Sequence, residues 1–309
     1  TYDDRRVLQH SVGQVLGQRE SRKGFRQLED TKFMNIIGLG KAGCNIADGF
    51  AQYGQYSIYK IDVGLEGTRC LNIKEQAGPE EYEAKAPSMK TFFKNVKGDT
   101  TLIIGGSGAI SAMCLRIMEQ IKSSCNISVL YIQPDTQLLS EEKKMHEKVT
   151  YNVLQEYARS GQINDICLVN NPQLENILDN VPIMGYYNKL NELIVSTIHM
   201  TNVYKNTDPV MGALSGPGKT KRIYTVGIFD IENNEEKLFF PLDTVRERGY
   251  IYSISKDRLQ SESGLHKQIT SQMKEKLLDE NMNVSFGVFP TEYNADYGYV
   301  LCYSPNIQS

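Results

Sequence analysis

The sequence has no apolar run of the roughly 20 residues that a membrane-spanning helix needs. Its first residues, Thr1 to Arg6, also lack the apolar segment of a secretory signal peptide. We therefore expect a soluble, cytoplasmic protein without direct membrane insertion.

Patterns typical of metal and redox sites are missing as well. The six cysteines are dispersed without a CxxC pair, and the four histidines have no acidic or thiol partner at ligand spacing. We expect no metal site built by side chains of this chain, and cysteines that are buried thiols in a reducing compartment.

An excess of positive charge is also absent. The chain carries 34 Lys and Arg against 37 Asp and Glu, for a net charge of -3. No global field would draw it to a polyanion, so we expect no nucleic-acid partner. With 309 residues, 40% of them hydrophobic, the chain is long enough for two domains.

The first half of the chain alternates short apolar runs with helical segments. The runs, each typical of a strand, cover residues 33–37, 57–61, 100–104, 127–132 and 163–169. The strongest helical segments cover 45–53 and 141–157. This alternation predicts an α/β domain with a Rossmann-like parallel sheet and helices on both faces.

The second half begins with a long helix over 186–203, which no Pro or Gly interrupts. A loop rich in Gly, Ser, Pro and Lys follows at 212–221. Four strands are then expected at 222–229, 250–255, 284–289 and 298–303, with the last two joined as a hairpin. A helix is expected between the second and third of these strands, at 265–278. We place the seam between domains along the long helix and the loop.

The predicted organisation has four parts. They are an N-terminal helical arm over 1–32, a nucleotide-binding domain over 33–185, a central helix with its loop over 186–211, and a smaller C-terminal α+β domain over 212–309. The arm either docks on its own domain or reaches a neighbouring subunit, and the sequence leaves both open.

A first glycine turn lies between a predicted strand and a predicted helix. Gly38, Gly40 and Gly43 form a GxGxxG pattern, and Asp62 closes the next strand. Glycines let a ligand approach the backbone, and a helix N-terminus offers unpaired N–H groups. The turn predicts a phosphate site, with a purely structural glycine turn as the alternative. Lys41 either pairs with phosphate or is a solvated lysine.

A second glycine cluster, Gly105, Gly106, Ser107 and Gly108, follows the strand at 100–104. Since parallel strands end at one edge of a sheet, the two loops can converge on one polyphosphate. A nicotinamide-dependent oxidoreductase would explain the first turn and Asp62 but needs no second cluster.

The two glycine loops, followed by the long helix, resemble the tubulin/FtsZ superfamily, and the likeness runs over most of residues 33–304. This resemblance implies a tubulin/FtsZ-like fold: a nucleotide-binding domain, a long central helix and a smaller second α/β domain. It also implies GTP or GDP as ligand, Mg²⁺ when GTP is bound, and head-to-tail assembly with copies of itself.

The resemblance assigns roles to single residues. Glu141 and Asn170 resemble positions near the ribose, and Tyr187 and Asn191 resemble the aromatic and asparagine that hold guanine. Asp208 resembles the catalytic acid that reaches the nucleotide of the next subunit. The candidate nucleotide-binding residues are Gly38, Gly40, Lys41, Gly43, Asn45, Asp62, Gly105, Gly106, Ser107, Gly108, Glu141, Asn170, Tyr187 and Asn191.

Two departures from the family pattern count against nucleotide chemistry, whereas Lys41 departs in the opposite direction. Ile110 stands in the second loop where a close backbone approach to phosphate is expected, and its side chain takes up room. Met211 stands three residues after Asp208, where FtsZ has a second acid, and a thioether cannot accept a proton. We expect slow or lost GTP hydrolysis, a degenerate GTPase at most.

Three functions fit these residues. The first is a cytoskeletal or scaffolding protein that binds guanine nucleotide and assembles head to tail. The second is a structural protein, for example in a virion, that keeps the fold without nucleotide. The third is an NAD(P)-dependent oxidoreductase, which leaves the second glycine cluster and the long helix unexplained. Compact divergent members of the superfamily occur in phages and plasmids, and the eroded motifs suit such an origin.

Overall fold

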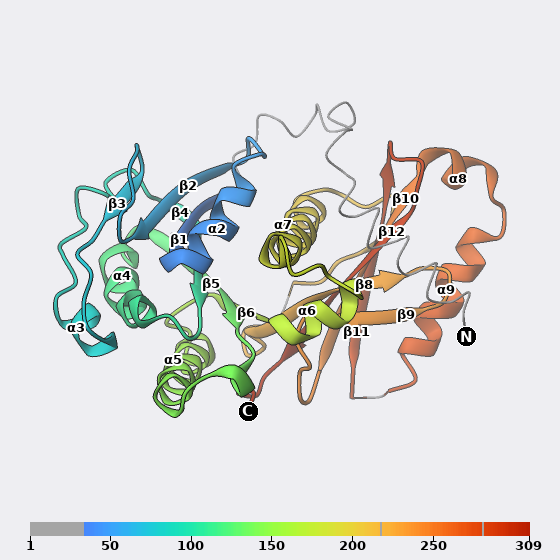
Figure 1. The fold of residues 1–309 in the computed structure, drawn as a ribbon. Coiled ribbons are helices and arrows are strands. Elements are labelled where there is room, and N and C mark those ends of the chain that lie inside the picture. The colour runs from blue at the N-terminus through green and yellow to red at the C-terminus, as the bar shows by residue number, and fades with distance from the viewer. Residues whose placement is uncertain (1–33, 217, 280) are drawn as a thin grey trace. The chain divides into compact units, whose positions relative to one another are not determined.

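The computed structural model describes residues 34–216, 218–279 and 281–309 (Figure 1). The predicted helical arm over 1–32 lies outside the described residues. The described chain divides into two compact units, an N-terminal unit up to Pro172 and a C-terminal unit from Gln173.

The N-terminal unit is built on a parallel sheet with the strand order β3-β2-β1-β4-β5-β6. Asn35 to Leu39, consecutive residues of β1, are all buried, which requires cover on both faces of the sheet. The predicted parallel sheet is therefore confirmed. The strands are β1 (Met34–Leu39), β2 (Tyr56–Asp62), β3 (Cys70–Asn72), β4 (Gly98–Gly105), β5 (Cys125–Gln133) and β6 (Asp165–Asn170).

The helices of this unit are α2 (Gly40–Phe50), α3 (Pro79–Ala84), α4 (Cys114–Ile121) and α5 (Glu141–Arg159), and α6 (Asn171–Leu178) begins where the unit ends. Helix α5 agrees with the prediction. Its start is fixed by Ser140, whose hydroxyl accepts from the N–H of Lys143, with Glu141 and Glu142 in the first turn. Helix α2 begins five residues earlier than predicted, so Gly40 to Gly43 form its first turn.

Strand β1 lies between β2 and β4, which places the two glycine loops side by side. The chain adds β2 and β3 on one side of β1 and then crosses to add β4 on the other. Leu39 of β1 is in register with Ile104 of β4, so both strands end at the same edge. This reversal of strand order is the place where open α/β sheets hold their ligands.

The C-terminal unit combines a long helix, α7, with a mixed sheet (Figure 1). The strand order of this sheet is β8-β12-β10-β11-β7, and β9 pairs with β8. Its elements are α7 (Tyr186–Lys205), β7 (Met211–Ala213), β8 (Ile223–Asp230), β9 (Glu235–Leu238), β10 (Glu247–Ser255), α8 (Lys256–Ser261), α9 (Leu265–Lys276), β11 (Asn283–Thr291) and β12 (Tyr297–Ser304). From Leu193 to Thr201 every residue of α7 is buried, as in a core helix.

The predicted hairpin between the last two strands is wrong. β10 lies between β11 and β12, parallel to the first and antiparallel to the second. Helices α8 and α9 form the crossover that a parallel β10–β11 pair requires. Tyr250, Ile251 and Tyr252 of β10 are fully buried, so this strand needs a partner on each side.

Two further expectations concern cysteines and membranes. Cys44, Cys114, Cys167 and Cys302 are buried free thiols, whereas Cys70 and Cys125 are only partly buried, so the expectation of buried thiols is met by four of the six. Among the described residues, no helix combines the length and the apolar character needed to cross a bilayer.

A polar cluster around Glu236 ties β9 to β10 and α9. Its carboxylate accepts from the hydroxyl of Tyr250 at 2.7 Å and from the ammonium of Lys276 at 2.8 Å, and it pairs with Arg248 at 2.5 Å. Burial alone would raise the pKa of Glu236, but the hydrogen bonds from Lys276 and Tyr250 and the charge of Arg248 outweigh it and hold that pKa below its ordinary value.

Glu236→Gln should lower the free energy of unfolding at pH 7 by about 2–3 kcal/mol, because two half-buried cations lose their counter-charge. A carboxyl whose pKa is lowered by folding stabilises above its unfolded pKa of about 4.3, and this stabilisation fades as pH falls through the folded pKa. Urea unfolding of parent and variant should thus converge in acid. Glu235→Gln, at the exposed neighbour, is the control. A difference that persists unchanged at pH 3 would contradict this account.

Candidate functional site

The first glycine loop joins β1 to α2 at very close range. A Cβ on Gly38 would lie 2.5 Å from the carbonyl oxygen of Gly43, and a Cβ on Gly43 would lie 2.5 Å from the carbonyl oxygen of Ile103 in β4. Backbone atoms cannot move aside as a flexible side chain can. Gly38 and Gly43 are therefore required by the packing of α2 on β1 and β4, whatever ligand the loop holds.

Lys41 and Asn45 are exposed at the start of α2. No side chain caps this helix, and its first turn holds no acidic residue. The unpaired N–H groups and the dipole at a helix start favour an anion, whereas a lysine there is unfavourable without one. No ion pair joins Lys41 to a described residue, so its ammonium is available to a ligand.

The second glycine loop follows β4 and is closed by its own hydrogen bonds. The hydroxyl of Ser111 donates to the carbonyl of Gly105 at 2.5 Å, and the N–H of Ser111 donates to the carbonyl of Gly108 at 2.9 Å. A 3₁₀ turn over Ala109–Met113 precedes α4, so the loop opens onto this turn before the predicted helix. Ser107 is partly exposed, and His146 of α5 lies at hydrogen-bond distance, 3.1 Å, from the Gly108 carbonyl.

A buried carboxylate lies behind this second loop. The hydroxyl of Tyr131 donates to Glu147 at 2.9 Å, and the amide of Gln133 donates to the same oxygen at 3.3 Å. Burial and the charge of Glu147 raise the pKa of Tyr131 far above its ordinary value. A Cβ on Gly106 would collide with the Tyr131 hydroxyl. Gly106 is thus fixed by packing, as Gly38 and Gly43 are.

Ile110 fills the space between the two glycine loops. Gly40 has φ +69°, and a Cβ built on it would lie 2.5 Å from Cγ2 of Ile110. Ile110 is only 8% exposed. A Cβ built on Gly105 would lie 3.1 Å from the Cβ of Ala42, so the loops also approach each other closely at their other end. The structure brings the two predicted phosphate loops together, but with an apolar side chain between them.

The remaining candidates of the N-terminal unit lie at strand and helix ends. Asp62 ends β2 and accepts from the N–H of Val63 at 2.8 Å. Asn170 ends β6, where its amide donates to Gln133 at 2.8 Å. Glu141 is exposed at the start of α5 and pairs with Lys144 at 2.7 Å.

Tyr187 and Asn191 lie one turn apart on α7 in the C-terminal unit. Tyr187 is 65% exposed and contacts Tyr186 edge to face, with ring centroids 5.1 Å apart. Ile183 and Met184, just before the helix, are 93% and 90% exposed. We call Ile183, Met184 and Tyr187 the α7 head patch. Tyr187 and Ile183 also line a hollow of about 470 Å³.

The loop after α7 separates Asp208 from Met211. Asp208 is exposed and makes no hydrogen bond or ion pair with a described residue, so it does not cap the loop. Met211 begins β7, is in register with Val288 of β11, and packs against the apolar core of the C-terminal unit. A hydrogen bond of 2.8 Å from the N–H of Val210 to the carbonyl of Val288 fixes the segment.

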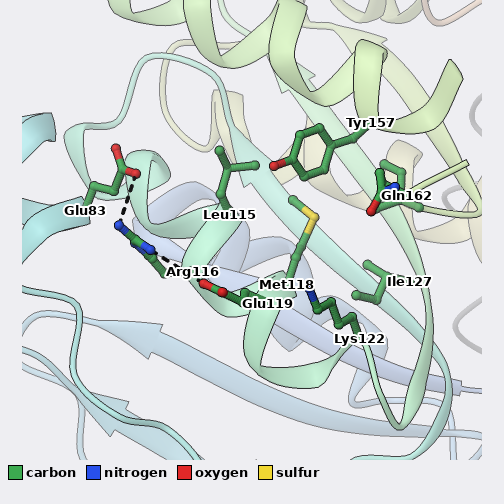
Figure 2. A pocket seen from close by; sticks show the side chains of 10 residues that line it. Glu83, Leu115, Arg116, Met118, Glu119, Lys122, Ile127, Tyr157 and Gln162 are labelled. Atoms are coloured by element: carbon green, nitrogen blue, oxygen red, sulfur yellow. Dashed lines mark ion pairs between the residues drawn. The ribbon is translucent and has the colours of Figure 1, made fainter. Parts of the chain in front are cut away.

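A second hollow has a volume of about 270 Å³. Figure 2 shows side chains that line it, among them Arg116 and Tyr157. Ile127 near the start of β5 and Ile163 just before β6 line it, so it lies at the opposite edge of the sheet. Arg116 faces Glu83 and Glu119 at 3.9 and 3.5 Å. None of the predicted site residues lines this hollow.

Sequence reasoning missed Glu147 and left His146 without a role. Both follow the predicted start of α5 within a charged run, where a buried acid looks like any solvated one. Histidine is expected to be packed or solvated, and His199 on α7 is buried at 6% exposure. This burial lowers the pKa of His199 to about 3. Within the described residues, no three His, Cys, Asp or Glu side chains gather into a metal site.

Solved structures of TubZ and FtsZ are similar to this chain over nearly its whole length. A protofilament of Bacillus thuringiensis serovar israelensis TubZ in its GTPγS form has a TM-score of 0.65 at 14% identity and covers 91% of this chain and 88% of its own. An empty FtsZ dimer from M. jannaschii has a TM-score of 0.61 at 13% identity, covering 90% of each chain. A four-stranded TubZ-Bt filament has a TM-score of 0.62 at 12% identity, covering 90% and 89%.

No protein-family model and no curated sequence matches the chain. The structural similarity confirms the tubulin/FtsZ-like fold that the glycine loops and the long helix predict.

Gly40→Ala should lower the free energy of unfolding by about 2–4 kcal/mol, because it adds a side chain at positive φ and against Ile110. Combining Gly40→Ala with Ile110→Ala should remove the steric clash and restore that part of the lost free energy of unfolding. The changes caused by the two substitutions should therefore not be additive. Thermal or urea unfolding of the four proteins of this cycle measures the coupling. Additive effects within about 0.5 kcal/mol would show that Gly40 and Ile110 are not in contact.

Proposed function

We propose that this protein is the subunit of a homopolymer, with a tubulin/FtsZ-like fold, that assembles without turning over GTP. The packing of Met211 against the core of the C-terminal unit carries the proposal. With a packed thioether at this position, Asp208 would be a lone acid where paired acids orient the attacking water. Such a polymer would act in the cytoplasm, as a scaffold or as part of a larger assembly such as a virion.

Two observations support self-assembly: the similarity of the fold to filament-forming proteins and the exposed apolar side chains of the chain. The similar structures include a TubZ protofilament and two- and four-stranded TubZ filaments. The α7 head patch exposes apolar side chains, and burying them in an interface would be energetically favourable. We propose that a second copy of the chain covers it.

We propose that guanine nucleotide is kept from the phosphate edge, and the position of Ile110 against Gly40, between the loops, supports this. A chain that keeps GTP or GDP, with Mg²⁺ beside GTP, is the second candidate. It is favoured by the exposed Lys41 at the start of α2 and by TubZ structures in GTPγS and GDP forms. In that case Asn45 and Ser107 would contact phosphate, Glu141 and Asn170 the ribose, and Tyr187 and Asn191 the base.

Assembly should weaken when the α7 head patch becomes polar. The double substitution Ile183→Ser and Met184→Ser should raise the concentration needed for assembly at least about tenfold, because each interface loses on the order of 1–2 kcal/mol per apolar side chain. Sedimentation and electron microscopy, with and without GTP, measure this. Leu278→Ser, at another residue of the C-terminal unit that is 80% exposed, is the control. A parent that stays monomeric at every concentration, or that requires GTP to assemble, would refute the proposal.

GTP turnover should stay near background even in assembled protein. Loss of one positioned group in such chemistry costs on the order of 100-fold to 10,000-fold in rate. Asp208→Ala should therefore change phosphate release by less than about twofold. Phosphate release is measured over a range of protein concentrations that spans assembly. Rapid turnover that rises with assembly and is lost in Asp208→Ala would show a working shared site instead.

A further inference from the structure

Ile110 lies where the two glycine loops come closest. Its Cγ2 methyl covers the α carbon of Gly40 in the first loop, and the same methyl lies 3.8 Å from a Cβ built on Gly108 in the second. One branch of a single side chain therefore lies beside glycines of both loops. At 8% exposure, the side chain leaves little room for solvent there.

The position of Ile110 is fixed by hydrogen bonds to the backbone of its turn. The Ser111 hydroxyl and N–H close the turn onto Gly105 and Gly108, and His146 approaches the Gly108 carbonyl from α5. Cγ2 is bonded directly to Cβ, so it cannot leave Gly40 unless χ1 rotates within a packed site or the whole turn moves. A phosphate cannot displace it as it would displace a long, flexible side chain.

A methyl group is a poor neighbour for a phosphate. Phosphate oxygens give up strong hydration and need N–H groups or cations in return, which Ile110 does not offer. The buried carboxylate of Glu147 lies behind the same loop, where a Cβ on Gly106 would meet its Cγ at 3.1 Å. Its negative charge adds to the cost of placing an anion at this edge.

We infer that Ile110 is the residue that excludes nucleotide phosphates from the tubulin/FtsZ-like edge, and that removing its γ-carbons converts the chain into a guanine-nucleotide binder. This inference deepens the proposed function, since it names what keeps the subunit free of nucleotide. The glycines, the α2 start and Lys41 remain in place, so one side chain separates the two states.

The substitutions at Ile110 separate this effect from a general loss of packing. Ile110→Val keeps both γ-carbons and should behave as the parent does. Ile110→Ala and Ile110→Gly remove the methyl that covers Gly40, and Ile110→Ser opens the same space with a hydroxyl. Ile121→Ala, the same truncation at a buried position of α4, controls for a loosened unit.

The experiment compares GDP with guanosine, which lacks phosphates, by calorimetry on each nucleotide-free protein. Parent, Ile110→Val and Ile121→Ala should bind GDP no more tightly than guanosine. Ile110→Ala and Ile110→Gly should bind GDP at least tenfold more tightly than guanosine. Circular dichroism and thermal unfolding establish that each variant is folded. If Ile110→Ala does not fold, Ile110→Ser takes its place in the comparison.

Two results would overturn the inference. One is a parent that already prefers GDP to guanosine at least tenfold. The other is a set of folded Ala, Gly and Ser variants without any gain for GDP. Sedimentation of the same proteins tests the proposed function separately, because loss of assembly in the parent would refute the homopolymer and leave the phosphate result standing.

Discussion

The contact between the backbones of α2, β1 and β4 is the constraint on which the N-terminal unit depends. Gly38 lies against Gly43, and Gly43 lies against the carbonyl of Ile103, at distances that no side chain would allow. This contact sets the start of α2 and brings the ends of β1 and β4 together. The two glycine loops meet because of it, and the narrow gap between them is what Ile110 fills.

The two residues on which the proposed loss of nucleotide chemistry rests are both apolar and both packed within the fold. Ile110 lies against Gly40 within the N-terminal unit, and Met211 packs against the core of the C-terminal unit. Under the proposal, these two residues remove nucleotide chemistry and leave the packing surfaces of the fold in place, since packing and catalysis use different atoms.

Much of the fold follows from the sequence, and less of the site does. The alternation of apolar runs and helical segments predicts the parallel sheet, and an uninterrupted apolar pattern predicts α7. The hairpin prediction failed because pairing depends on β10, which no local pattern around β11 and β12 reveals. The glycine pattern cannot separate phosphate binding from packing, because both need a bare α carbon. The sequence indicates that Ile110 takes up room in the second loop, but only the structure places its methyl on Gly40.

The most direct test of a closed phosphate edge is mass analysis of the small molecules released when the purified parent protein is denatured. The account predicts that guanine nucleotide is recovered at far less than one molecule per chain, from monomer and from polymer alike. Recovery of GDP or GTP at close to one molecule per chain would contradict it.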